Sequence, residues 1–302
     1  MKQGESNEVL RKYRDFKKFD IVDDYSDHHY KQPNLENKQP EKNWAKNIQR
    51  EWRILDDGLP DTIFVRAYES RMDLLRAVII GPEGTPYHDG LFFFDVYFPY
   101  KYPTDPPKVR YHSRGLRINP NLYSSGTVCL SLLNTWRGKK NEKWTPGVST
   151  MLQVLVSIQG LILNAKPYFN EPGFERSSGS RTGEYRSMLY NEQTLIYSLK
   201  TMVYTMNKPP KHFEDLVVGH FHERAVNILT ICKSYTRGVG VECDVSGGVI
   251  KKGTYGFREN VKRYMRTLVG SFEKIGVAEM DKFIPQSRSL AQKISAFFCI
   301  KE

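Results

Sequence analysis

The sequence predicts an α+β fold, in which helices and an antiparallel sheet occupy different parts of the chain. Three observations carry this prediction. An amphipathic helical pattern begins near residue 43, four short strand-like runs follow it without a helix between them, and a strongly apolar helical pattern begins at residue 149. Consecutive strands joined by turns pair as an antiparallel meander, so the order favours α+β over an alternating α/β sheet.

The first helix is expected to begin at Asn43, a residue type that can cap a helix, and to end at Asp57-Gly58-Leu59-Pro60. Its apolar residues recur every three or four positions: Trp44, Ile48, Trp52 and Leu55. Turn residues bound each run of the meander. The four predicted strands are Thr62 to Tyr68, Leu74 to Ile80, Leu91 to Phe98, and Lys108 to Tyr111.

A long irregular stretch follows from 112 to 147, and a loop of this length in a compact domain is usually functional. The next helix, 149–163, is apolar on nearly all sides, which predicts burial at the centre of the domain. Helical patterns then resume to the end of the chain, so we expect an α-helical C-terminal extension. These patterns cover residues 185–206, 213–235 and 257–300.

Residues 1–42 have nine basic and nine acidic side chains and no apolar period, which predicts a largely unstructured arm. His28 and His29 stand beside three aspartates and could bind a metal. A solvated acidic patch is the favoured interpretation, because adjacent residues cannot easily point at one ion.

The composition excludes several classes. The 302 residues contain 39 % hydrophobic side chains, no 18-residue apolar run and no apolar stretch at the start typical of a secretory signal. Four widely spaced cysteines indicate free thiols in a reducing compartment. The net charge of +11 suggests an acidic partner such as nucleic acid, but the charge is diffuse and favours a solvated basic surface.

The strongest chemical signal is Cys129, which follows Asn121 by eight residues. A lone cysteine without a matching base suits acyl transfer by thioester exchange, because its thiolate is both nucleophile and leaving group. Asn121, held after Pro120, is a plausible N–H donor to the oxyanion that forms when an amine attacks. The alternative is a structural cysteine buried in a turn-rich loop.

Residues 43–206 resemble the ubiquitin-conjugating enzymes, because several of that family's signatures occur in the family's order. The family carries a His-Pro-Asn tripeptide eight residues before its active-site cysteine, counted from the Asn, and the chain has Asn119-Pro120-Asn121 and Cys129 at this spacing. The other matching segments are Gly81-Pro82-Glu83-Gly84-Thr85-Pro86-Tyr87, Gly90-Leu91-Phe92-Phe93-Phe94, the proline-rich stretch Phe98–Pro107, Trp144-Thr145-Pro146 and the apolar helix.

The resemblance implies three parts: a flexible arm over 1–42, a conjugating core over 43–206 and a helical extension over 207–302. It also implies that Cys129 accepts ubiquitin from the activating enzyme as a thioester and transfers it to a substrate lysine. Asn121 would then stabilise the oxyanion. Glu171 is the candidate that orients or deprotonates the lysine, with a solvent-facing loop carboxylate as the alternative.

Four departures from the family pattern stand out. Asn119 replaces the usual His, Ser131 stands where many ubiquitin carriers have Asp, and Thr104 occupies the position of a large apolar ligase contact. The loop 134–143 is longer than usual and basic, so it either contacts an acidic partner or only aids solubility. The segments 119–123 and 129–133, this loop, the string over 167–172 and the C-terminal part resemble a branch of large proteins that includes plant phosphate-response conjugating enzymes and hybrid conjugase-ligases.

The resemblance names ubiquitin, the activating enzyme, protein substrates and a ubiquitin ligase as partners, in the cytoplasm and also the nucleus. No phosphate-binding glycine motif is present, so we expect no cofactor in this chain, with ATP used by the activating enzyme. We expect no metal, no membrane span and no nucleic acid. Two rival hypotheses remain: an inert scaffold with the same fold, and a basic nucleic-acid-binding module.

Overall fold

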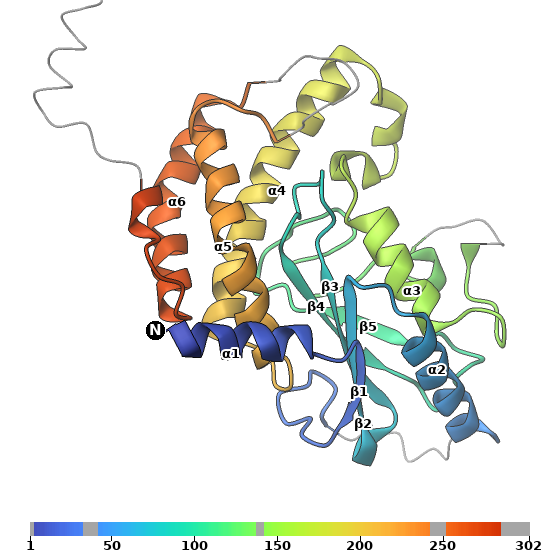
Figure 1. The fold of residues 1–302 in the computed structure, drawn as a ribbon. Helices are drawn as coiled ribbons and strands as arrows, with labels where there is room; N and C mark the ends of the chain where they lie inside the picture. Colours follow the sequence, from blue (N-terminus) through green and yellow to red (C-terminus); the bar gives the residue numbers. More distant parts are fainter. Residues whose placement is uncertain (1–2, 33–41, 137–141, 242–251, 285–302) are drawn as a thin grey trace, which may run out of the picture.

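The structure, a computed structural model, describes residues 3–32, 42–136, 142–241 and 252–284. These residues form a five-stranded sheet with helices on both of its faces (Figure 1). None of their helices is long and apolar enough to cross a membrane. The α+β class is therefore confirmed. The helices are α1 (Gln3–Arg14), α2 (Trp44–Gly58), α3 (Met151–Ser157), α4 (Arg181–Asn207), α5 (Glu214–Thr236) and α6 (Tyr255–Lys274).

The sheet has the strand order β1-β2-β3-β4-β5, and its last four strands form the predicted antiparallel meander. Their observed bounds agree with the predicted runs to within one residue at each end. The pleat places Phe64, Val78 and Phe93 on one face and Val65, Ala77 and Phe94 on the other. The strands are β1 (Phe19–Val22), β2 (Ile63–Tyr68), β3 (Leu74–Ile80), β4 (Leu91–Tyr97) and β5 (Lys108–Tyr111).

The N-terminal arm differs from the expectation of an unstructured segment. Residues 3–14 form α1, and residues 19–22 form β1, which pairs in parallel with β2 at the edge of the sheet. The arm's few aromatic residues explain this order, because they pack against distant parts of the chain. Tyr13 lies edge-on to His220 of α5, and Phe16 packs between Phe64 and Phe213. Because these partners are distant in the sequence, the contacts produce no apolar period within the arm itself. Residues 33–41 of the predicted arm lie outside the described residues.

One face of the sheet packs on α2 and α3, and the opposite face packs on the C-terminal helices. In Figure 1, α4, α5 and α6 stand side by side on the side of the sheet away from α2 and α3. Phe213, at the start of α5, is fully buried and contacts Phe93 of β4 edge-to-face. The helical C-terminal extension therefore shares a core with the sheet. The proposed boundaries at residues 42 and 206 stay a prediction.

The apolar pattern over 149–163 forms two short pieces, α3 and a π-helical turn, Ile158–Ile162. Thr150 caps α3 in a reciprocal capping box with Gln153. Burial on nearly all sides is wrong for this segment, because Val156 is 45 % exposed and Leu161 is 64 % exposed. The helix lies on the sheet with one face and presents the other to solvent. Asn43 likewise precedes α2 without a capping hydrogen bond from its side chain.

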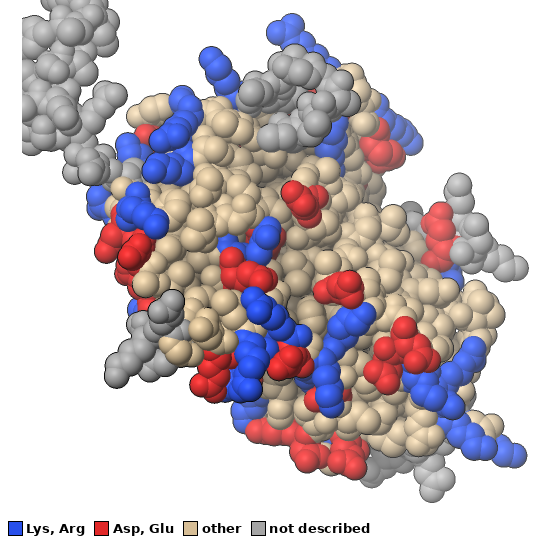
Figure 2. Space-filling model, viewed as in Figure 1, with Lys and Arg blue, Asp and Glu red and all other residues tan. Residues whose placement is uncertain are grey.

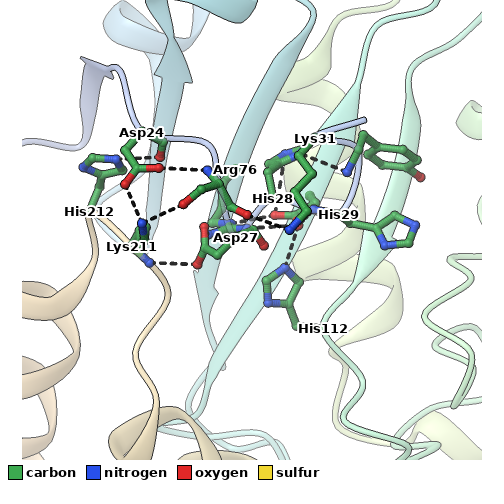
Figure 3. Close-up of polar contacts among 12 residues, drawn as sticks. Asp24, Asp27, His28, His29, Lys31, Arg76, His112, Lys211 and His212 are labelled. Carbon is green, nitrogen blue, oxygen red and sulfur yellow. Dashed lines mark hydrogen bonds and ion pairs between the residues drawn. The ribbon is translucent and has the colours of Figure 1, made fainter. Parts of the chain in front are cut away.

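A buried polar cluster ties the arm to the sheet (Figure 3). Its centre is Asp95 of β4, whose carboxylate accepts hydrogen bonds from Arg76 at 2.6 and 3.1 Å and from the backbone N–H of His29 at 2.7 Å. His112 Nε2 lies 3.0 Å from the same carboxylate. Asp27 of the arm pairs with Arg76 at 2.8 Å. Buried charges are stable only when they are paired. This cluster pairs Asp27 of the arm and Asp95 of β4 with Arg76 of β3.

The prediction of a solvated patch is wrong for His28, because its side chain is only 1 % exposed. Its Nε2 lies 3.1 Å from the Leu75 carbonyl oxygen, and its Nδ1 accepts from the Tyr30 backbone N–H at 3.1 Å. These two partners require the neutral imidazole with its proton on Nε2. Burial lowers the pKa of His28, and nearby Asp95 only partly offsets this effect.

We predict that Asp95→Asn lowers the free energy of unfolding by about 3 kcal/mol, because it leaves the buried Arg76 short of a carboxylate partner. Urea unfolding at pH 7 measures the change. The matched control is Asp20→Asn, which removes an exposed pair with Lys17 at 3.4 Å and is expected to change stability by less than about 0.5 kcal/mol. Equal effects of the two variants would contradict this prediction.

The same cluster predicts that acid destabilises the protein in two stages. Burial opposes ionisation of Asp95, but His112 and Arg76 outweigh it and hold the pKa of this carboxyl below its usual range. A depressed carboxyl pKa contributes stability that is lost as pH falls below about 4, and the lowered pKa of His28 adds a loss beginning below about pH 6.5. Unfolding followed from pH 8 to pH 3 checks both stages. Asp95→Asn should weaken the lower one, to which Asp24 and Asp89 also contribute through their lowered pKa values.

Candidate active site

The irregular stretch after β5 folds back on itself as a compact loop. Arg110 pairs with Thr127, and Leu122 bridges to both Asn119 and Val128. Gly126 allows the loop to lie against β5, since its φ is +91° and a Cβ there would be 2.7 Å from the Tyr111 carbonyl oxygen. These pairings place Cys129 directly beside Asn121, eight residues earlier in the chain.

Cys129 and Asn121 are joined by two hydrogen bonds. The Cys129 backbone N–H donates to the Asn121 carbonyl oxygen at 2.9 Å, and Asn121 Nδ2 donates to the Cys129 carbonyl oxygen at 2.8 Å. Both residues are 8 % exposed. After Cys129, the Thr135 hydroxyl donates to the Val128 carbonyl oxygen at 2.7 Å and accepts from the Leu130 N–H at 2.9 Å. The backbone around the thiol is thus held on both sides.

The fully buried Asn119 side chain holds the turn that carries Asn121. Its Nδ2 donates to the Tyr87 hydroxyl at 2.8 Å and to the Ile162 carbonyl oxygen at 2.7 Å, while its Oδ1 accepts from the Asn121 N–H at 2.8 Å. An amide supplies two donors and an acceptor on one planar group, so one side chain satisfies three partners. The amide at this position therefore holds the loop together by hydrogen bonding.

Asn170 contributes to the same network, although sequence reasoning gave it no role. Its Nδ2 lies 3.3 Å from the Leu161 and Ile162 carbonyl oxygens, and its Oδ1 accepts from Asn164 Nδ2 at 2.7 Å. The π-helical turn leaves these carbonyl groups available near the site. The one sequence feature that could have indicated Asn170 is its position directly before Glu171. Its contacts anchor the segment that carries Glu171 beside the Asn119 network.

Three side chains set the electrostatics of the Cys129 thiol. Burial raises its pKa above the ordinary value, and the negative charge of Glu171 adds to this rise. A hydrogen bond from the Tyr123 side chain and the positive charge of Arg117 lower the thiol pKa and partly offset burial. The net effect is a thiol that is protonated at neutral pH, with a cation and a carboxylate both close enough to influence it.

Glu171 lies at the site and forms an ion pair with Arg117, whose Nη2 is 3.3 Å from Glu171 Oε2. The side chains are 39 % and 48 % exposed, respectively, so the pair contributes only about 0–1 kcal/mol to stability. The structure thus brings Glu171 together with Cys129 and Asn121. The Glu171 carboxylate is also partly exposed to solvent, which agrees with the alternative interpretation of a solvent-facing loop carboxylate.

The second cysteine that the structure describes takes no part in this site. Cys232 is buried in the core beside α6, and burial raises its pKa to about 12. Cys243, Cys299 and half of the basic loop, residues 137–141, lie outside the described residues. In the described part of the chain, no group of three His, Cys, Asp or Glu side chains could hold a metal ion.

Comparison with known proteins gives a consistent set of similarities. Residues 47–191 match the family model described as ubiquitin-conjugating enzyme. The chain is 58 % identical to a probable ubiquitin-conjugating enzyme E2 25 of Arabidopsis thaliana over 281 residues, which are 91 % of this chain and 46 % of the relative. It is 55 % identical to a putative ubiquitin-conjugating enzyme E2 38 of the same plant, over 88 % of this chain and 84 % of the relative.

A more distant similarity extends to a much larger protein. The chain is 43 % identical over 199 residues to the human dual E2 ubiquitin-conjugating enzyme/E3 ubiquitin-protein ligase BIRC6, covering 63 % of this chain and 4 % of that protein. The chain spans about half the length of the first two Arabidopsis relatives that it matches.

We predict that Asn119→Ala lowers the free energy of unfolding by about 2–4 kcal/mol, because it leaves the Asn121 N–H and the Ile162 carbonyl oxygen without their buried partner. Chemical denaturation provides the measurement. Ser125→Ala is the control in the same loop, since it removes only exposed contacts to Thr127 and should cost less than about 0.5 kcal/mol. A loss below 1 kcal/mol for Asn119→Ala would show that the turn does not depend on the amide.

Proposed function

The chain belongs to the ubiquitin-conjugating enzyme family, and from this premise we propose that it carries ubiquitin as a thioester on Cys129 and transfers it to substrate lysines. The observation that carries the proposal is the reciprocal pairing of Cys129 with Asn121, with Arg117 and Glu171 beside the thiol. A cysteine buried only for packing would not need this set of neighbours.

In the first step, the Cys129 thiolate attacks the thioester carbonyl carbon that links ubiquitin to the activating enzyme. A new carbon–sulfur bond forms on Cys129, and the thiolate of the activating enzyme leaves. The raised pKa of Cys129 keeps the thiol protonated at rest, so the step needs loss of that proton when the partner docks. Arg117 favours the thiolate at this moment through its positive charge.

In the second step, the neutral amine of a substrate lysine attacks the thioester on Cys129. The carbon–nitrogen bond forms and the carbonyl oxygen becomes an oxyanion. The Cys129 thiolate leaves as the carbonyl forms again, and the nitrogen releases its extra proton to water to give the neutral amide. The ammonium proton passes to Glu171, directly or through water, before the amine attacks. A thioester is already activated, so a positioned carboxylate suffices where a protease needs a stronger base.

Asn121 serves this step in two ways. One Nδ2 hydrogen is used at rest by the Cys129 carbonyl oxygen, and the amide carries a second N–H that can reach the oxyanion. The Asn121 Oδ1 is buried and has no hydrogen-bond partner among the described residues. One hydrogen bond therefore holds the Asn121 side chain, and its second N–H is available to the reaction.

The proposed partners are ubiquitin, the activating enzyme, protein substrates and a ubiquitin ligase, in the cytoplasm and also in the nucleus. The chain takes no cofactor in this proposal, and the activating enzyme uses the ATP. The relative named as both conjugating enzyme and ligase supports a second possibility, a ligase-like activity within the same chain. Nucleic acid is not a proposed partner, since Lys and Arg are interspersed with Asp and Glu on the face in Figure 2.

We predict that wild-type protein, incubated with activating enzyme, ATP and ubiquitin, gives a thiol-sensitive band of added ubiquitin mass on a non-reducing gel. Cys129→Ala should abolish the band because it removes the acyl acceptor. Cys232→Ala is the matched control and should retain it, since this cysteine lies in the core. Absence of the band in folded wild-type protein would favour the scaffold, and salt-dependent nucleic-acid binding without charging would favour the binding module.

We further predict that Asn121→Ala retains charging but slows discharge onto lysine about 100-fold, the usual cost of losing one oxyanion donor. Single-turnover discharge of pre-charged protein measures this rate. A thermal melt identifies any unfolding from the lost bond to Cys129. Unchanged discharge in a folded variant would refute the oxyanion role of Asn121.

A further inference from the structure

Arg117 joins three parts of the proposed site, although neither the sequence patterns nor the proposed function gives it a role toward the acceptor lysine. Its guanidinium lies 3.3 Å from Glu171 Oε2, 3.4 Å from the Pro120 carbonyl oxygen, and 4.7 Å from the centre of the Tyr123 ring. The stacking on Tyr123 and the bond to the Pro120 turn hold this cation beside Glu171.

The ion pair has consequences for the acceptor. A lysine ammonium that approaches the site carries the same charge as Arg117 and seeks the same carboxylate. Nearly half of the Arg117 side chain and more than a third of the Glu171 side chain are exposed, so the pair is solvated and can be exchanged. Pro120 and Tyr123 still provide contacts for Arg117 after it releases Glu171.

We propose that Arg117 is a positioning residue that competes with the incoming lysine for Glu171. The resting ion pair occupies the carboxylate until an acceptor cation replaces the guanidinium. This inference rests on the proposed function and deepens it, because it assigns selection of the acceptor to one named ion pair. In the transfer to lysine, Arg117 itself forms and breaks no covalent bond. It leaves Glu171 as the lysine ammonium arrives, and the ammonium proton then passes to the freed carboxylate before the amine attacks the thioester.

The test uses the whole chain, charged with ubiquitin, and follows discharge onto free lysine over a range of lysine concentrations. Arg117→Gln removes the competing charge, and we expect the half-saturating lysine concentration to fall about two- to fivefold, the range that an exposed ion pair supports. Arg117 also favours the leaving Cys129 thiolate through its charge, so we expect the limiting discharge rate to fall while the half-saturating lysine concentration falls as well. The matched control is Arg114→Gln in the same loop, which should leave both values unchanged.

A double-mutant cycle separates competition for Glu171 from general repulsion of the lysine cation. In a Glu171→Gln background, Arg117→Gln should have no further effect on the half-saturating lysine concentration. A persistent effect in that background would overturn the proposal, as would an unchanged lysine concentration in Arg117→Gln alone. A fall in the limiting rate alone would assign Arg117 to support of the loop and would also overturn the proposal.

A second readout does not depend on ubiquitin transfer. Alkylation of Cys129 in the uncharged protein as a function of pH should shift upward in Arg117→Gln, because the guanidinium lowers the pKa of this thiol. Cys232 is fully buried, and a Cys129→Ala variant corrects for any background from the other cysteines. If wild-type protein does not form the ubiquitin thioester, the proposed function is wrong, and this inference, which rests on it, is wrong as well. If charging is normal but lysine dependence is unchanged, only the role of Arg117 fails.

Discussion

The Asn119 side chain joins three segments that are far apart in the sequence, and the geometry of the candidate site depends on this connection. It bonds the turn that precedes β4 through Tyr87, the π-helical turn through the Ile162 carbonyl oxygen, and its own loop through the Asn121 N–H. Because the amide is fully buried, each bond is protected from water. The spacing between Asn121 and Cys129 then follows from a short pairing within the loop.

The meander and the helices α2, α4 and α5 were predictable because their signals are local. Strand bounds at Leu74–Ile80 and Lys108–Tyr111 follow directly from apolar runs between turn residues, and α4 and α5 follow from helical spacing. The arm was not predictable in this way. Its order depends on packing against Phe64, Phe213 and His220, which no periodicity within residues 1–42 can reveal.

The candidate site shows the same division between local and distant signals. Cys129 and Asn121 stand out through spacing within one loop, so sequence reasoning finds them. Arg117 and Asn170 acquire their roles only when the loop meets the segment after the π-helical turn. Family resemblance indicated Glu171, but it did not indicate that a cation of the same chain already occupies this carboxylate at rest.

The docking of the arm has a consequence for the order in which the chain folds during synthesis. Tyr13 contacts His220, which lies 207 positions later in the chain, and Lys211 bonds to Ser26, which lies 185 positions earlier. Contacts of this separation cannot form until the C-terminal helices have left the ribosome, whereas the meander and the active-site loop need only residues that emerge earlier. The arm is therefore synthesised before the meander but reaches its native position after it, and the sheet face that α4 and α5 cover stays exposed until those helices are made.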